Sequence, residues 1–362
     1  MQDLTLKNNW DYYNIAGDGR AVCLQDKGSN TVCKNVCLLS HQDTYYTNNQ
    51  NGNYYWENSE VHGTVDFICG EGTLFMEKSK LVVEKRNADG SGECTITAPS
   101  TKEGNDYGYV FSNCEIENNA QKYNYGRAWN NAPRCAYINT TVNDDKLVAS
   151  RWTLKGMNEN PATAFVEYNT MDAEGNVVSP SSHVVTFTAS KSSQTNPDFE
   201  TILTATQAAE FALDKVFTGW TPAEFTVQVD APDAEIAEDV ITWTPADDAI
   251  AYALFKNDEL MGITTEASFD AGAGNGAHGA PRKAEGDDVY TIRAANAHGG
   301  FGEAKTISVA TGIEGVITEK GNVVSTHYYN VAGARVSDSA KGVLIKVEKL
   351  ENGKTVTTKI VR

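Results

Sequence analysis

The 362-residue sequence lacks long apolar runs and is poor in basic residues. No stretch of 18 apolar residues occurs, so no transmembrane helix and no membrane insertion are expected. The 30 Lys and Arg residues face 48 Asp and Glu residues, and the net charge of −18 argues against nucleic acid as a partner. A neutral or partly neutralised polymer fits this charge better.

The amino end also lacks the features of a signal peptide. Met1 is followed by Gln-Asp-Leu-Thr-Leu, which is a strand-like run and not a charged region before an apolar one. We therefore expect either a cytoplasmic protein or a chain whose true amino end is missing.

Cys-x-x-Cys pairs are absent, which makes a cysteine zinc site improbable. The seven cysteines lie between Cys23 and Cys135, and their odd number leaves at least one thiol unpaired. Most sit within or beside apolar strand-like runs, so buried free thiols are favoured over a disulfide framework. Cys33 and Cys37 are four residues apart, but no second pair or nearby histidine completes a metal site.

Two aspartates occur in matching contexts. Asp43 follows His-Gln, Asp66 follows Gly-Thr-Val, and the two are 23 residues apart. Asn35 lies eight residues before the first and Asn58 eight residues before the second. A fixed period of this length is typical of a solenoid. Because stacked strands lie about 4.8 Å apart, the two carboxyl groups are expected to be close enough to share a proton.

The same unit continues with less regular spacing. Asn113 and Asn139 each begin an Asn-x-x-aliphatic copy, and Ser79 is predicted to begin the copy between Asn58 and Asn113. The wider gap after Ser79 predicts an inserted surface loop. Stacked asparagines can form a hydrogen-bonded ladder. The alternative is a set of ordinary strand-turn units in an Asn-rich protein.

The chain is predicted to be all-β, with three parts. Residues 1–228 form the solenoid, and an amphipathic helix over 204–217 is expected to cover the edge of its last coil. Short alternating strands over 229–312 predict a β-sandwich that resembles a fibronectin type III module. Residues 313–362 carry Tyr-Asn-x-x-Gly-x-x-Val and Lys-Gly-Val-x-Ile, and this resembles the sorting tail of some secreted Gram-negative bacterial proteins. The alternative for the tail is a small β-unit without a sorting role.

Three segments resemble the signature blocks of pectin methylesterases. They are Gln42-Asp43-Thr44, Gly63 to Ile68, and Gly126-Arg127-Ala128-Trp129. The resemblance covers about residues 1–228 and implies a right-handed parallel β-helix that removes methyl esters from homogalacturonan (pectin). It further implies an enzyme that needs no cofactor or metal, acts as a monomer, and is secreted or held at a bacterial cell surface.

The resemblance also implies residue roles. Asp66 is the expected nucleophile, and Asp43 the acid that protonates methanol and then the base for water. Gln42 is expected to donate to the oxyanion, and Arg127 to pair with Asp66. The residues expected to bind substrate are Trp129, Arg20, Phe67 and Tyr46.

The sequence departs from the family pattern at three points. Arg20 stands where the family has a second oxyanion glutamine, and Ala128 stands where it commonly has proline. The chain also begins after the family's first coils, so we expect a fragment whose exposed first strand makes it prone to aggregate. The competing hypotheses are a non-catalytic pectin-binding protein and a β-helix lyase or polygalacturonase. A lyase needs a calcium-binding acidic cluster, and none is seen near Arg127.

Overall fold

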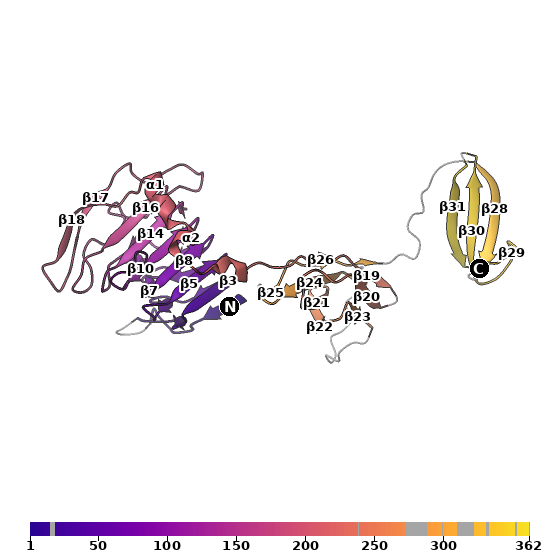
Figure 1. Ribbon diagram of the computed structural model, residues 1–362, viewed down its shortest axis with the longest axis horizontal. Helices are drawn as coiled ribbons and strands as arrows, with labels where there is room; N and C mark the ends of the chain where they lie inside the picture. The colour runs from indigo at the N-terminus through magenta and orange to yellow at the C-terminus, as the bar shows by residue number, and fades with distance from the viewer. Residues whose placement is uncertain are drawn as a thin grey trace. The chain divides into compact units, whose positions relative to one another are not determined.

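The computed structural model describes residues 1–14, 19–237, 239–272, 288–298, 300–309, 322–330, 333–351 and 353–361 (Figure 1). The chain forms two compact units. The first comprises Met1–Asp230 with Asp247–Ile250 and Ala294–Gly302. The second comprises Ala231–Ala246, Ala251–Arg293 and Glu303–Arg362.

The first unit is a stack of parallel strands, each paired with strands of the coils before and after it. One sheet contains β2 (Leu24–Asp26), β4 (Tyr45–Thr47), β7 (Val65–Gly70), β10 (Glu93–Pro99) and β13 (Lys122–Gly126). The second contains β5 (Asn53–Glu57), β8 (Thr73–Glu77), β11 (Tyr109–Ser112), β14 (Arg134–Ile138) and β16 (Ala164–Tyr168). The third contains β1 (Gln2–Lys7), β6 (Glu60–Gly63), β9 (Lys80–Val83), β12 (Glu115–Asn118) and β15 (Thr141–Val142).

The long strand β3 (Asn30–Leu39) joins the second and third sheets, because its first half pairs with β5 and its second half with β6. All of these pairs are parallel, and successive strands of a sheet come from successive coils. The predicted all-β fold with a parallel β-helix is confirmed.

The interior of the coils is filled by stacked aromatic side chains. The rings of Phe111 and Tyr137 lie 4.7 Å apart between centroids, and those of Tyr125 and Tyr137 lie 4.2 Å apart. Trp152 stacks on Phe165 at 4.7 Å. Burial of such large apolar surfaces is the main favourable term in the stability of the stack.

The turn between the second and third sheets repeats one backbone conformation. Seven residues there have φ between 49° and 53°: Asp3, Asn35, Asn58, Lys78, Asn113, Asn139 and Asn169. Asn and Asp tolerate this left-handed region better than other non-glycine residues, which explains the asparagine repeat. Part of the expected ladder is present, since Asn169 Nδ2 donates to Asn139 Oδ1 at 2.9 Å.

The predicted register of the middle copy is wrong by one residue. Glu57 pairs with Glu77 and Val61 with Leu81, so Lys78, not Ser79, lies opposite Asn58. Val61 and Leu81 are both fully buried. The register follows the buried side chains, because a slip of one residue would turn Leu81 out of the core.

The predicted continuous helix over 204–217 is also wrong. The structure has α1 (Ala205–Ala208), a 3₁₀ turn η1 (Ala209–Phe211), α2 (Leu213–Val216) and a second 3₁₀ turn η2 (Pro222–Phe225). Ala212 has ψ 151° and interrupts the helix. In one continuous helix, positions 208 and 216 would point about 80° apart. The interruption allows both Ala208 and Val216 to be buried.

These turns cover a sheet face and not the edge of the last coil. Ala208 and Val216 pack with Phe75 and Val110 on the outer side of the second sheet. The last coil is covered instead by the antiparallel hairpin of β17 (Val184–Thr188) and β18 (Thr195–Glu200). Phe187 of this hairpin lies 5.5 Å from Phe165, between ring centroids.

The second unit contains mainly antiparallel sheets. One sheet contains β19 (Ala234–Ala237), β20 (Val240–Trp243), β23 (Ser268–Asp270) and β27 (Ser308–Val309). Another contains β21 (Ala251–Lys256), β22 (Glu259–Thr264), β24 (Tyr290–Asn296), β25 (Gly300–Phe301) and β26 (Lys305–Thr306), of which β25 and the end of β24 from Ala294 belong to the first unit. A separate sheet contains β28 (Val323–Asn330), β29 (Arg335–Val336), β30 (Val343–Leu350) and β31 (Thr355–Val361).

Buried and exposed residues alternate along β19 and β20, as expected of strands with one covered face. Trp243 and Tyr252, from the first two of these sheets, contact each other with ring centroids 5.0 Å apart. The predicted boundary between residues 312 and 313 lies outside the described residues. None of the described helices has the length and apolar character needed to cross a membrane.

Candidate active site

Asp43 and Asp66 occupy equivalent positions on adjacent coils. Tyr45 pairs with Ile68, 23 residues later, and the backbone N–H of Asp43 donates to the carbonyl oxygen of Val65 at 3.1 Å. Both aspartates have left-handed backbone conformations, with φ 57° and 49°. The constant 23-residue step therefore places the two side chains side by side at the amino ends of β4 and β7.

Asp66 lies where the pairing of β7 with β10 is irregular. Val65 pairs with Thr95 and Ile68 with Thr97, so two residues of β7 oppose one of β10. Such bulges redirect side chains and are frequent beside active sites. The nearby Gly63 is required by packing, because a Cβ there would lie 2.0 Å from that of Phe67.

Arg127 binds Asp66 through two hydrogen bonds. Its Nε donates to Oδ1 at 2.8 Å and its Nη2 to Oδ2 at 2.5 Å. The Asp66 side chain is 7% exposed and that of Arg127 is 30% exposed. This contact spans 61 residues of sequence and connects β7 to the segment that follows β13.

Burial and pairing act in opposite directions on Asp66. Burial raises the pKa of its carboxyl group, whereas the hydrogen bonds and charge of Arg127 lower it. Burial lowers the pKa of Arg127, but the bonds to Asp66 and the charges of Asp66 and Asp43 outweigh this and raise it. The net effect raises the pKa of Asp66 above its ordinary value. The paired hydrogen bonds from the guanidinium favour the ionised form of the carboxyl group, because a carboxylate accepts at both oxygens.

Arg20 and Gln42 are also neighbours on adjacent coils. They form an isolated parallel bridge, and the backbone N–H of Ala21 donates to the carbonyl oxygen of Gln42 at 2.9 Å. Arg20 therefore occupies, one coil earlier, the position that Gln42 occupies beside Asp43. Both side chains can donate hydrogen bonds, so this edge of the site carries two donors.

Most of the predicted site residues line one cavity of about 290 Å³. Its lining residues are Arg20, Gln42, Asp43, Asp66, Cys69, Ala98, Arg127, Trp129 and Met157. Trp129 is half-buried, and its ring lies 6.0 Å from that of Tyr46 between centroids. The two rings are tilted by 51° to each other, and Tyr46 is not among the lining residues, so Trp129 is the aromatic residue of the lining on which a sugar ring can stack.

The segment with Ala128 in place of proline is held on both sides. The backbone N–H of Trp129 donates to Pro99 O at 3.1 Å, and that of Met157 donates to Ala128 O at 2.8 Å. The side-chain amide of Asn158 donates to Trp129 O at 2.9 Å. These bonds constrain the segment that a proline would otherwise stiffen.

Phe67 does not lie where the sequence interpretation placed it. Phe67 is fully buried and belongs to the hydrophobic core of the β-helix, so it does not face the cavity. Side chains of successive strand residues alternate between the two faces, but the irregular backbone at Asp66 makes this alternation hard to infer from sequence. The prediction of Phe67 as a substrate contact is wrong.

Three lining residues were not predicted: Cys69, Ala98 of β10, and Met157. Cys69 follows Asp66 by three residues, and burial together with the charges of Asp43 and Asp66 raises the pKa of its thiol well above the ordinary value. It is therefore a neutral thiol and a poor nucleophile. Met157 comes from a loop beyond β15, and no sequence motif marks it.

All seven cysteines are free thiols, as predicted. The prediction that no histidine lies near Cys37 is wrong, because His62 and Glu60 lie beside it on the neighbouring strand β6. The sequence interpretation considered only residues close along the chain, whereas parallel stacking brings together residues more than twenty apart.

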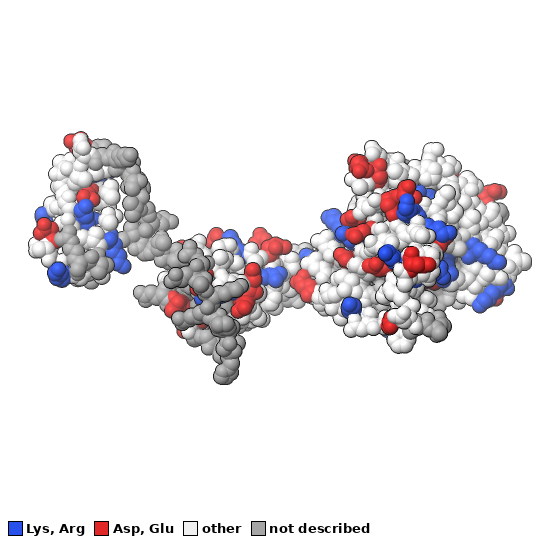
Figure 2. Space-filling view, turned by 180° about the vertical axis from the view of Figure 1, so that it is seen from behind, with Lys and Arg blue, Asp and Glu red and all other residues white. Residues whose placement is uncertain are grey.

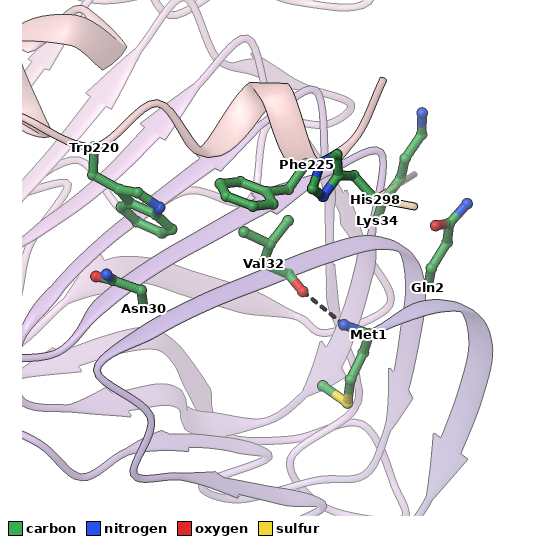
Figure 3. A pocket seen from close by; sticks show the side chains of 8 residues that line it. All are labelled: Met1, Gln2, Asn30, Val32, Lys34, Trp220, Phe225 and His298. Carbon is green, nitrogen blue, oxygen red and sulfur yellow. Dashed lines mark hydrogen bonds between the residues drawn. The ribbon is translucent and has the colours of Figure 1, made fainter. Parts of the chain in front are cut away.

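A second cavity, of about 600 Å³, lies elsewhere in the first unit (Figure 3). Its lining residues are Met1, Gln2, Asn30, Val32, Lys34, Trp220, Phe225 and His298. These described lining residues include neither Asp nor Glu, so this cavity offers no acid–base pair. On the face of the molecule drawn in Figure 2, acidic and basic side chains of the first unit are interspersed and form no continuous basic stripe.

The fold and the cavity define a parallel β-helix protein with a candidate active site built on two aspartates. The family model described as Pectinesterase matches residues 1–215, which is more than half of the chain. The chain belongs to the pectinesterase family.

Several named relatives are similar to this chain. Pectinesterase A of Dickeya dadantii (strain 3937) is 27% identical over 243 residues, which cover 61% of this chain and 65% of the relative. Pectinesterase 5 of Arabidopsis thaliana is 30% identical over 171 residues, which cover 44% of this chain and 28% of the relative. The chain thus spans less than two thirds of the length of either relative.

Solved structures of this family were also matched. A pectin methylesterase from Erwinia chrysanthemi is 25% identical, with 61% of this chain and 70% of that chain covered and a TM-score of 0.46. A pectin methylesterase crystallised with a hexasaccharide is 26% identical, with the same coverage and a TM-score of 0.47.

Proposed function

We propose that this protein is a carboxylic ester hydrolase that removes methyl esters from homogalacturonan and releases methanol. The observation that carries the proposal is the Asp66 carboxyl group, held by two hydrogen bonds from Arg127 in a cavity that Asp43 and Gln42 also line. These residues all lie in the segment that matches the pectinesterase family. The substrate class is inferred from the names of the relatives.

In the first half-reaction, an oxygen of the Asp66 carboxylate attacks the carbonyl carbon of the methyl ester. The negative charge that develops on the carbonyl oxygen is stabilised by the Gln42 amide. Asp43 begins protonated, because a second ionised carboxylate next to Asp66 is unfavourable. Its proton passes to the methoxy oxygen as the carbon–oxygen bond breaks, and methanol leaves an acyl group on Asp66.

In the second half-reaction, the ionised Asp43 removes a proton from water. The hydroxyl attacks the acyl carbon, the bond to Asp66 breaks, and the Asp66 carboxylate is restored. The product carboxyl group then loses its proton to the solvent. Arg127 keeps Asp66 in one orientation through both steps.

The aromatic pair Tyr46 and Trp129 is proposed to bind the sugar ring beside the scissile ester. Arg20 is proposed to serve as the second donor to the oxyanion, or to bind the free carboxylate of a neighbouring residue of the polymer. Both roles suit a polyuronide whose carboxyl groups are partly esterified. The site contains two arginines beside two aspartates, and the protein as a whole is acidic.

The remaining assignments follow from the proposed activity. Because the polymer lies outside the cell, we propose that the protein is secreted or held at a bacterial cell surface and acts as a monomer. Residues 229–312 are proposed to be a fibronectin type III-like module, and residues 313–362 a sorting tail. None of the described residues of either region lines the catalytic cavity.

The test is methanol release by the full chain from highly methylesterified homogalacturonan. Release that is absent from the Asp66→Ala variant and from reactions with demethylated polymer would support the proposal. Retention of the wild-type chain on the polymer without any methanol would favour the alternative of a non-catalytic pectin-binding protein.

A further inference from the structure

Four polar side chains converge on the outer face of the third sheet: Cys37, Glu60, His62 and Glu84. Within the described part of the chain, Cys37, Glu60 and His62 form the one group of three metal-ligating residues whose ligand atoms all lie within 4.8 Å of one another. None of these four residues lines the catalytic cavity.

The parallel register of β3 and β6 brings the group together. Cys37 is paired with Glu60, and Leu39 is paired with His62. Glu60 and His62 are two residues apart on one strand, so both point to the same face as Cys37. The intervening Leu38 and Val61 are fully buried in the core, which holds the two strands in this register.

His62 is held in one orientation by two carboxylates. Its Nδ1 lies 2.8 Å from Glu84 Oε1, and its Nε2 is in hydrogen-bond contact with Glu60 Oε1. Glu84 is itself fixed, because its backbone N–H donates to Gly63 O at 2.7 Å. Histidines that bind metals typically bond a carboxylate through the nitrogen opposite the metal, and the Glu84–His62 pair has this arrangement.

We infer that this group is a zinc-binding site, with Cys37 Sγ, Glu60 carboxylate and His62 Nε2 as ligands and water in the fourth position. A thiolate, an imidazole and a carboxylate together favour zinc or a similar transition metal over calcium or magnesium, which prefer oxygen ligands alone. Glu84 is a positioning residue that fixes the His62 ring. Binding releases the proton of the Cys37 thiol, and the zinc ion replaces any proton held between Glu60 and His62.

The charges around the group suit a cation. Lys80 is paired with Glu60 across the strands, but its Nζ donates to Glu117 at 3.2 Å. Glu60 and Glu84 both face His62, so an imidazolium held between two carboxylates is the competing arrangement without metal.

The expected role is to brace the coils that carry the catalytic aspartates. The ligands come from β3 and β6, and the turn after each of these strands leads to Asp43 and Asp66. An ion that links these strands would stabilise the folded state relative to the unfolded chain. Methanol release is expected to need no zinc, since the catalytic cavity shares none of these residues.

The experiment is a calorimetric titration of the full chain with Zn²⁺ after treatment with a chelator. We expect one equivalent to bind and to raise the thermal unfolding midpoint. In a parallel titration with Co²⁺, the near-ultraviolet charge-transfer absorption of a cobalt–thiolate bond is expected. Glu84→Gln should weaken zinc binding by roughly 10–100-fold, and Cys37→Ser and His62→Gln should weaken it more.

Cys23→Ser is the matched control, because Cys23 is a half-buried free thiol just before β2, in the same coil as Cys37, and lies outside the ligand group. It should bind Co²⁺ with the same absorption as wild type. Circular dichroism separates loss of ligand from loss of fold, and Cys37→Ser provides a second reading if His62→Gln does not fold. The proposal is overturned if wild type binds no zinc, or if Cys37→Ser retains wild-type affinity and the cobalt–thiolate absorption.

Discussion

The β-helix and the antiparallel sheets after it differ in how far apart in the sequence their paired residues lie. In the β-helix, Gly126 pairs with Thr97, 29 residues earlier, and Arg127 reaches Asp66 across 61 residues. In the last sheet, Thr355 pairs with Lys349, six residues earlier. Parallel stacking thus places equivalent residues of successive coils next to each other, although they are far apart in the sequence. The hairpins instead pair residues that are close in the sequence.

This difference explains where the chemistry lies. Stacked coils place residues of the same type side by side at equivalent positions, as with Asp43 and Asp66. Two neighbouring carboxyl groups can share one proton, because ionisation of both is unfavourable. An antiparallel hairpin positions residues opposite each other without repeating a turn. Four predictions test this contrast, from the largest expected effect to the smallest.

Asp66→Ala is expected to abolish methanol release, because no acyl-enzyme can form without the carboxylate. The release of methanol from methylesterified homogalacturonan measures this directly. Cooperative unfolding of the variant in urea is the control for folding. Turnover comparable to wild type would show that Asp66 is not the nucleophile and that the stacked pair of aspartates is not the active site.

Asp43→Asn is expected to lower kcat by roughly 10²–10⁴-fold, the usual range for the loss of a general acid and base. The amide keeps the size and the left-handed turn, so the unfolding midpoint should change little. Pre-steady-state methanol release separates the two half-reactions. A variant that retains most of its activity would show that the two aspartates are not a functional pair.

Arg127→Gln is expected to move the acidic limb of the kcat/KM profile to higher pH. Burial raises the pKa of Asp66 and Arg127 lowers it, so removal of the guanidinium should raise the pKa of Asp66 further. The nucleophile must be ionised, and activity is therefore lost at a higher pH as the solution is acidified. Arg151→Gln is a control, because Arg151 pairs with buried Glu167 outside the cavity. An unmoved acidic limb would separate Arg127 from the ionisation of Asp66.

Deletion of residues 229–362 is expected to leave kcat/KM unchanged, since none of the residues that the structure describes in this segment lines the catalytic cavity. The measurement is the rate of methanol release by the truncated protein 1–228 at low substrate concentration. A truncated protein that is soluble and cooperatively folded but inactive would contradict the division of labour between the two regions.

Much of the candidate site could be predicted from local sequence. The equal spacing of Asn35 and Asn58 from the two aspartates revealed one coil length of 23 residues, and the structure places Asp43 and Asp66 in register. The resemblance to the family placed Arg20 at the position of a second oxyanion glutamine, and in the structure Arg20 forms a bridge with Gln42. Where the coils have the same length, the separation of two residues in the sequence predicts whether they lie next to each other on adjacent coils.

Other features depend on packing that linear spacing does not encode. The register at Lys78 follows the buried pair Val61 and Leu81, and the burial of Phe67 follows the irregular backbone at Asp66. Met157 enters the cavity from a loop that no motif marks. Each of these outcomes depends on which side chains the core accepts, and that is determined by neighbours in adjacent coils.

The amino-acid order was therefore sufficient for the fold class and for the pair of aspartates, because repeated turns are a local property of the chain. The arginine that pairs with Asp66 was expected only because the motifs resemble those of a known family. The helix break at Ala212, the inward position of Phe67 and the meeting of Cys37 with His62 were settled only when the coils stacked. The physical reason is that stacking joins residues from different coils at a separation of about 4.8 Å, and the buried side chains between them choose the register.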